Sequence, residues 1–366
     1  MQKELLADFL HLYHSIQSAS ARLPALLARF DGNPRQLLVS STDTLRTHGL
    51  RHDAICRLRG ARHPQVDIDL EWAERDANQL LCYSDTAYPE LLRQTINFPA
   101  LLYARGDPGL LSTPQIAIVG SRNCTPGGAQ NAFDFAAQCA CAGLVVTSGM
   151  ALGIDSAAHR GALSVSDKTI AVTATGQDQV YPSRNRGLAD EIAERGLIVS
   201  EFPLGTKARA AYFPQRNRII SGLAVATLVV EAAQRSGSLI TARLAAEQGR
   251  DVLAVPGSIH NPQTRGCHQL IRDGATLVET TRDIAGELGS LFNFALQQQS
   301  SQAPGLVESL DNEQRALLDS IGYDPVNCDI LVQRSGLTID KLSSMLVILE
   351  LNDLIQSAPG GCYVRI

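Results

Sequence analysis

The sequence predicts an α/β protein built on a doubly wound, mostly parallel sheet, preceded by a small helical domain and followed by a small separate domain. Seven apolar runs rich in β-branched residues lie between positions 115 and 280 and alternate with segments of helical length. Because these runs are apolar throughout, each is typical of a parallel strand that helices cover on both faces.

The first 65 residues predict a small all-helical domain. Apolar residues recur at helical spacing and are interrupted by short turns at 30–34 and 48–50. Short helices joined by a Leu-x-x-His-Gly-Leu turn resemble sterile-alpha-motif or helix-hairpin-helix domains. A docking module without chemistry is the interpretation that we favour for this region.

Residues 66–290 are predicted to form the sheet domain. Its first part, up to position 114, suggests a helix and an edge strand that lead into the sheet. The seven strand-like runs are 116–119, 144–147, 169–174, 197–200, 224–230, 252–255 and 276–278. Predicted helices at 129–142, 188–195, 241–248 and 267–273 each end before a glycine, as helices commonly do.

A polar, low-complexity stretch then predicts a flexible linker at 291–306 and a separate domain at 307–366. The latter has two or three helical runs, one of them at 342–351, and a glycine turn into a short strand near 362–364. This order is typical of a winged helix. The domain holds 4 basic and 9 acidic residues, so we expect it to contact protein rather than read DNA.

The composition is that of an ordinary folded chain without a membrane span or a signal peptide, and we expect a cytoplasmic protein. Eight scattered cysteines without a C-x-x-C motif predict neither disulfides nor a zinc site. The net charge of −5 argues at first against nucleic acid. However, residues 184–218 hold seven basic and four acidic side chains, which predicts a local basic patch.

Ligands of open α/β sheets bind at the carboxyl ends of the strands, so the loops after the runs are the candidate site. After the first run, Gly120 and Ser121 begin a glycine-rich turn, and Arg122 offers a guanidinium to a phosphate. The dinucleotide fingerprint G-x-G-x-x-G is absent there, which disfavours a nicotinamide dehydrogenase.

The loop after the second run offers backbone amides at Ser148 and Gly149, and Asp155 is placed to cap the following helix. Asp155 and His159 stand four residues apart, a spacing that also suits an acid and base pair. A structural use of these two side chains is the favoured interpretation.

Two further loops combine cations with other binding groups. Tyr181 precedes Arg184 and Arg186, the combination of aromatic ring and charge that single-stranded nucleic acid requires. Packing of the Tyr181 ring is an equal alternative.

In Phe213-Pro-Gln-Arg-Asn-Arg218 the proline is expected to start a helix, which places Arg216, Asn217 and Arg218 in its first turn. Cations there oppose the helix dipole and so point to an anion. An internal salt bridge to Glu231 or Glu201 is the alternative.

A glycine- and serine-rich turn at Ser236, Gly237 and Ser238 completes the set of candidate residues. These motifs in this order are Ile-Val-Gly-Ser-Arg, Ser-Gly-Met-Ala-Leu-Gly-Ile-Asp, Tyr-Pro, Phe-Pro-Gln-Arg-Asn-Arg, Ser-Gly-Ser-Leu-Ile-Thr and Ala-Val-Pro-Gly. Together they resemble the DprA/Smf family of natural transformation. Members often carry a basic residue directly after Tyr-Pro, whereas this chain has Ser183 there.

The resemblance implies a non-catalytic, homodimeric protein that binds single-stranded DNA, shields incoming DNA in competent cells and promotes RecA loading. It also implies an extended Rossmann domain between a sterile-alpha-motif-like domain and a winged helix, with Arg122 contacting DNA. No catalytic residue, metal or cofactor is expected.

More distantly, the central part resembles nucleotide-processing phosphoribohydrolases. Their glycine-rich turn is followed within a few residues by a catalytic glutamate, but no carboxylate precedes Glu247 here. A nucleotide sensor would use the same pocket and stays an alternative.

Overall fold

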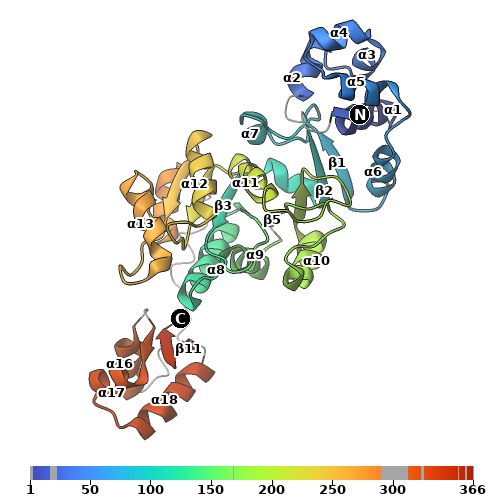
Figure 1. Cartoon of the computed structure of the whole chain (residues 1–366). Helices are drawn as coiled ribbons and strands as arrows, with labels where there is room; N and C mark the ends of the chain where they lie inside the picture. The colour runs from blue at the N-terminus through green and yellow to red at the C-terminus, as the bar shows by residue number, and fades with distance from the viewer. Residues whose placement is uncertain are drawn as a thin grey trace.

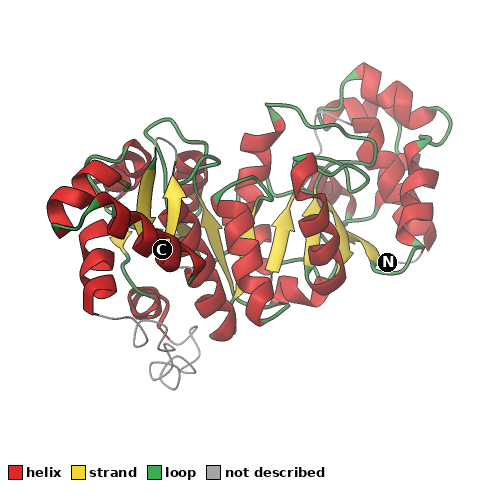
Figure 2. Ribbon diagram, turned by 90° about the horizontal axis from the view of Figure 1, so that it is seen from below, coloured by secondary structure: helices red, strands yellow, loops and turns green. Residues whose placement is uncertain are grey.

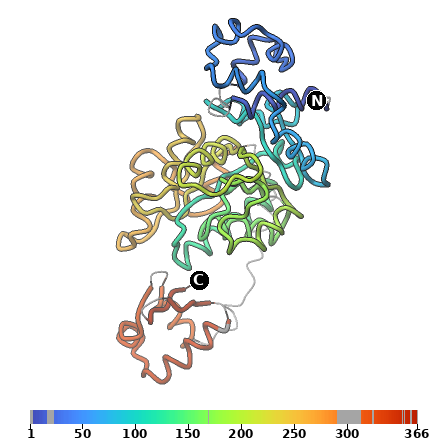
Figure 3. The backbone as a smooth tube through the Cα atoms, turned by 45° about the vertical axis from the view of Figure 1, so that its right-hand side comes forward, coloured from blue at the N-terminus to red at the C-terminus, as the bar shows by residue number. Residues whose placement is uncertain are grey.

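The computed structural model describes residues 3–16, 23–167, 169–289, 312–322, 325–352, 354–358 and 361–365. Helices near the N-terminus lie at one end of a central sheet domain, and a small C-terminal domain lies apart from the sheet (Figures 1 and 3). The predicted linker at 291–306 lies outside the described residues. No helix in the described ranges is long and apolar enough to span a membrane.

The central sheet has nine strands in the described part of the chain, in the order β1-β2-β6-β5-β4-β3-β7-β8-β9. Strands β3 to β9 pair in parallel. At one side of the sheet, β2 pairs antiparallel with both β1 and β6. The strands are β1 (Asn78–Cys82), β2 (Leu101–Gly106), β3 (Gln115–Val119), β4 (Val145–Ser148), β5 (Thr169–Val172), β6 (Leu197–Ser200), β7 (Ala226–Val229), β8 (Asp251–Ala254) and β9 (Thr276–Leu277). All seven predicted runs are strands. The strand predicted before them is β2, but it is not an edge strand as expected, because β1, which was not foreseen, pairs with its outer side.

Helices cover both faces of this sheet (Figure 2). Side chains alternate along a strand, so Ile116 and Ile118 of β3 pack toward one helical layer and Ala117 and Val119 toward the other. The first layer contains α8 (Pro126–Cys141), α9 (Ile154–Val165), α10 (Arg186–Arg195) and α14 (Thr281–Leu288). The second contains α7 (Glu90–Arg93), α11 (Tyr212–Leu223), α12 (Ser238–Glu247) and α13 (Arg265–Arg272). This confirms the doubly wound arrangement.

The N-terminal region is helical, as predicted, but it shares its core with the sheet. Its helices are α1 (Lys3–Ile16), α2 (Leu23–Leu27), α3 (Pro34–Val39), α4 (Thr42–Thr47), α5 (His52–Arg59) and α6 (Gln65–Ala73). Phe9 and Leu12 of α1 and Trp72 of α6 belong to one buried cluster with Leu101 and Tyr103 of β2. The buried core continues across residue 65, so the structure does not mark a boundary there. The domain boundary at this residue stays a prediction.

The C-terminal region contains α16 (Asn312–Ile321), α17 (Cys328–Ser335) and α18 (Ile339–Leu351) and the strands β10 (Val326–Asn327), β11 (Ile355–Ala358) and β12 (Cys362–Arg365). The strands pair antiparallel in the order β10-β12-β11. Leu317, Leu331, Leu346 and Ile355 pack together in a core of its own. Three helices backed by a three-stranded sheet confirm the winged-helix prediction.

Candidate anion-binding pocket at the sheet edge

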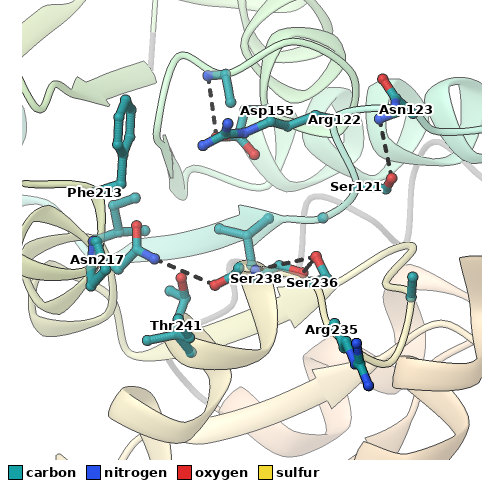
Figure 4. A pocket seen from close by; sticks show the side chains of 18 of the residues that line it. Ser121, Arg122, Asn123, Asp155, Phe213, Asn217, Arg235, Ser236, Ser238 and Thr241 are labelled. Atoms are coloured by element: carbon teal, nitrogen blue, oxygen red, sulfur yellow. Dashed lines mark hydrogen bonds between the residues drawn. The ribbon is translucent and has the colours of Figure 1, made fainter. Parts of the chain in front are cut away.

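A pocket of about 480 Å³ opens at the point where the strand order reverses. The chain leaves β3 toward β4, β5 and β6 on one side and returns to β7 on the other side. The loops after β3 and β7 therefore diverge and leave a crevice at their carboxyl ends, which is where open α/β sheets bind ligands. Figure 4 shows the side chains that line it.

The first wall is the loop after β3. A Cβ on Gly120 would lie 2.6 Å from Ile154 Cγ1, so only glycine fits this approach of the loop to α9. The Ser121 hydroxyl donates to Gln263 Oε1 at 3.0 Å and accepts from the amide of Asn123 at 3.1 Å. These two bonds fix the backbone of the loop at Ser121, directly before Arg122.

Arg122 is exposed at the mouth of the pocket and forms no salt bridge with any described carboxylate. Its guanidinium lies 5.1 Å from the ring centre of Phe213, within cation–π range. The ring holds the cation over the pocket and leaves the guanidinium edges free to donate hydrogen bonds. This is the geometry that suits a bound phosphate.

The opposite wall is the start of α12. Ser236, Gly237 and Ser238 line the pocket, and the first amides of this helix are bonded within the turn, Ser238 to Ser236 Oγ and Leu239 and Ile240 to the carbonyls of Ser236 and Gly237. Asn217 donates from Nδ2 to the Gly237 carbonyl, which ties this turn to α11 (Figure 4). Exposed Arg235 stands directly before the turn. A helix N-terminus and an arginine thus converge on the same space.

Arg216 forms the floor of the pocket rather than its rim. Helix α11 begins at Tyr212, two residues before Pro214, so Arg216 is its fifth residue. The prediction that Arg216 lies in the first turn is wrong, so the helix dipole gives no reason to expect an anion beside it. The side chain is 4 % exposed and donates from Nη1 to the carbonyls of Gly149 and Val172 at 2.5 and 2.6 Å.

Burial lowers the pKa of Arg216 to about 10, and the nearby Asp155 carboxylate opposes this shift. The guanidinium therefore stays charged at neutral pH. Three arginines and one aspartate line the pocket, so its net charge is positive although the chain as a whole is acidic.

Ser148 and Gly149 were expected to line the pocket, but the structure places them beneath it. Ser148 is fully buried and donates to the Ile118 carbonyl at 2.6 Å. The amide of Gly149 donates to Asp155 Oδ2 at 3.2 Å. These groups are used inside the protein, and the Gly149 carbonyl accepts from Arg216, so we no longer assign Ser148 or Gly149 a direct contact with a ligand.

The Asp155 and His159 pair has a structural role, as favoured from the sequence. Asp155 accepts bonds from loop amides instead of capping its own helix. His159 is fully buried 2.7 Å from the Thr169 hydroxyl, and burial lowers its pKa to about 3. A neutral imidazole out of reach of solvent has no access to a ligand.

Arg218 is held by an internal salt bridge with Glu201, the alternative recognised from the sequence. Both side chains are mostly buried, at 17 % and 12 % exposure. The other suggested acidic partner, Glu231, instead accepts bonds from Thr125 at the start of α8. Arg218 does not line the pocket, and we correct its expected role as a phosphate contact.

Tyr181 lies beside the pocket without lining it. Its ring is 48 % exposed and tilted against Phe213, with the ring centres 5.6 Å apart. Arg184 and Arg186 are exposed at the start of α10 and do not line the pocket. Contacts of these three side chains with a ligand stay predictions.

Sequence reasoning did not select two residues that the fold brings to this pocket. Phe213 and Arg235 stand inside motifs already noted, but neither was chosen. The signal was present for Arg235, since a basic residue directly before a glycine-rich helix start is well placed for an anion. Phe213 had no such signal, because its packing under Arg122 depends on the tertiary fold.

The described residues contain no cluster of histidine, cysteine or acidic side chains arranged to hold a metal ion. Asp155 is the one carboxylate among the residues that line the pocket in the described structure, and loop amides hold it. The fold and site define a doubly wound α/β protein with a positively charged pocket at the carboxyl ends of β3 and β7.

The chain belongs to the DprA/Smf family of DNA processing proteins. The family model for DNA recombination-mediator protein A matches residues 79–289, and that for the DprA winged helix domain matches residues 301–361. Protein Smf of Escherichia coli is 39 % identical over 82 % of this chain and 81 % of its own length. DNA processing protein DprA of Streptococcus pneumoniae is 42 % identical over 64 % of this chain and 85 % of its own.

Solved structures agree with this membership. The X-ray structure of DprA from Streptococcus pneumoniae has a TM-score of 0.69 and 36 % identity, and it covers 79 % of this chain and 98 % of that one. DNA processing protein A from Helicobacter pylori, described for its unique single-stranded DNA binding mode, has a TM-score of 0.54 and 30 % identity. It covers 59 % of this chain and 98 % of that chain.

Proposed function

We propose that this protein is a non-catalytic mediator of DNA recombination that binds single-stranded DNA in the pocket between β3 and β7. The observation that carries this proposal is Arg122, a cation without a described salt-bridge partner that Phe213 holds over a positively charged pocket. The single-stranded DNA binding described for the Helicobacter pylori relative supports the choice of ligand.

Arg122 and Arg235 hold phosphates in this proposal, and the positive N-terminal end of the α12 dipole adds to the attraction. Phosphate contacts carry no sequence information, so binding has weak sequence preference. Bases stack on the exposed ring of Tyr181, whose neighbour Phe213 supports it from behind. Stacking requires unpaired bases, and this requirement favours single strands over duplex.

We further propose that the protein acts as a homodimer in the cytoplasm, protects incoming transforming DNA and promotes RecA loading. The family description as a recombination mediator supports this role. Two linked pockets hold one strand more tightly than a single pocket because the second contact becomes intramolecular. The winged helix, with its excess of acidic residues, is assigned to protein contacts.

The experiment that tests the binding site compares the wild type with Arg122→Ala by fluorescence anisotropy on labelled oligothymidine and on a matched duplex across a salt series. We expect about tenfold weaker single-strand binding, as the loss of a charge-assisted hydrogen bond implies. The slope of log affinity against log salt should fall by about 0.7. Arg282→Ala, which removes an exposed arginine on α14 that does not line the pocket, is the matched control.

Equal affinities for Arg122→Ala and the control would place the DNA site elsewhere. Tight binding of a mononucleotide, with no gain from linked nucleotides, would favour the nucleotide sensor or the phosphoribohydrolase alternative. RecA loading is tested separately by the lag of RecA ATPase activity on strands already coated with single-stranded DNA-binding protein. The wild type should shorten this lag and Arg122→Ala should not.

A further inference from the structure

A second hollow of about 640 Å³ lies where the N-terminal helices meet the loop after β6. None of the residues that line it lines the first pocket. Its walls come from α1, from the start of α6 and the segment just before it, from the loop at 201–209 and from the start of α11. Residues far apart in the sequence therefore form one concave surface.

The sheet-domain wall of this hollow combines aromatic rings with free cations. The rings of Phe202 and Tyr212 lie 4.5 Å apart, and Arg209 lies 5.8 Å from the Tyr212 ring centre. Lys207 and Arg209 are exposed, and neither forms a salt bridge with a described carboxylate. The acidic residue in this wall, Glu201, is already paired with Arg218.

The opposite wall belongs to the N-terminal helices and is both aromatic and fixed. The rings of His14 and His63 stack with their centres 5.2 Å apart. Buried Asp69 accepts from Tyr103 at 2.6 Å and lies 2.7 Å from His14 Nε2. Tyr13 donates its hydroxyl to the Glu201 carbonyl at 3.0 Å, which ties this wall to the other one.

The start of α11 separates the two hollows. Tyr212 and Gln215 line the second hollow, whereas Phe213 and Pro214 line the first. Consecutive side chains of one helical turn thus face two binding surfaces. A strand that leaves the first pocket across this turn meets the Tyr212 ring next, with Lys207 and Arg209 beyond it.

We propose that the second hollow is a further subsite for the same single strand. One unpaired base stacks at Tyr212, and the adjoining phosphates bind Lys207 and Arg209. The rings of His14 and His63 close the far side, so the N-terminal helices take part in DNA binding. This inference rests on the proposed function, because it extends a strand already held at Arg122.

The test measures the double variant Lys207→Ala/Arg209→Ala against oligothymidines of two lengths, about 6 and about 20 nucleotides, chosen from the usual site sizes of single-strand binders. Arg272→Ala/Arg282→Ala is the control, since it removes two exposed cations that line neither hollow. For the long strand we expect about tenfold weaker binding than the control and a salt slope smaller by about 1.4, for two phosphates lost. The short strand, which fills the first pocket alone, should bind unchanged.

Arg122→Ala is measured in parallel to separate the two proposals. If Arg122→Ala weakens both strands while the Lys207 and Arg209 variant matches its control at both lengths, the subsite is wrong and the proposed function stands. If Arg122→Ala binds both strands as tightly as the wild type, the proposed binding site in the first pocket is wrong, and the subsite that rests on it is wrong as well. Loss of thymidine monophosphate binding in the double variant, without loss of the long strand, would make the hollow a free-nucleotide site and overturn the inference.

Discussion

The salt bridge between Arg218 and Glu201 gives the sharpest prediction, because it separates a structural arginine from a DNA-binding one. Arg218→Met leaves the Glu201 carboxylate buried at 12 % exposure without its partner. Breaking a buried pair in this way costs about 3 to 5 kcal/mol. We expect about 3 kcal/mol, the lower end, because the described structure shows one bond between the two groups and leaves Glu201 Oε1 without a partner.

The measurement is the melting temperature of Arg218→Met, Glu201→Gln and the double variant. A loss of about 3 kcal/mol corresponds to about 6 to 12 °C for a domain of this size. The double variant should recover most of this loss, because no unpaired charge remains buried. All three folded variants should keep the wild-type affinity for the short strand that fills the first pocket, since neither Arg218 nor Glu201 lines that pocket.

The pH dependence provides a second check on the same variants. Burial raises the pKa of Glu201, and Arg218 opposes this rise. Without Arg218, the folded-state pKa of Glu201 rises further above its unfolded value. The destabilisation caused by Arg218→Met is therefore largest at high pH, where Glu201 is charged, and decreases as the carboxyl is protonated. The deficit of Arg218→Met should therefore decrease between about pH 8 and about pH 5. A constant deficit of stability across this pH range, or a loss of short-strand affinity without a loss of stability, would refute the structural role of Arg218.

Two further predictions concern Gly149, which lies beneath the pocket against Arg216, and the buried His159 of α9. Gly149→Ala places a Cβ 2.1 Å from Arg216 Nη1, so we expect about 2 kcal/mol of destabilisation and weaker DNA binding. Gly127→Ala, whose Cβ would meet nothing within 4 Å, should cost no stability, and equal melting temperatures for the two would contradict the packing argument. His159 has a folded-state pKa lowered to about 3, so its contribution is present above the unfolded value of 6.5 and is lost as the pH falls below it. The stability difference between wild type and His159→Gln should change by about 2 kcal/mol from pH 6.5 to about pH 5 in thermal melts, and parallel curves would show that His159 does not titrate as described.

Much of the sheet domain could be predicted because its signals are local. A buried strand needs only a short apolar run, and a helix end needs only a residue such as Gly143 or Gly249 that accepts a positive φ. Strand β1 was missed because its pairing with β2 is a non-local contact at an antiparallel edge. The start of α11 was misplaced because proline is tolerated anywhere in a first helical turn, where its missing N–H leaves no bond unmade.

The sequence by itself determined the order of strands and helices and the loops that gather at one edge of the sheet. Parallel strands bring their carboxyl ends together whatever the surrounding side chains are, so Gly120, Arg122 and Ser236 could be assigned to one site. Only the tertiary structure decided which cations reach solvent. Within the described residues Arg122 has no salt-bridge partner, whereas Arg216 is buried and Arg218 is paired. These differences depend on partners such as Glu201 that lie elsewhere in the chain.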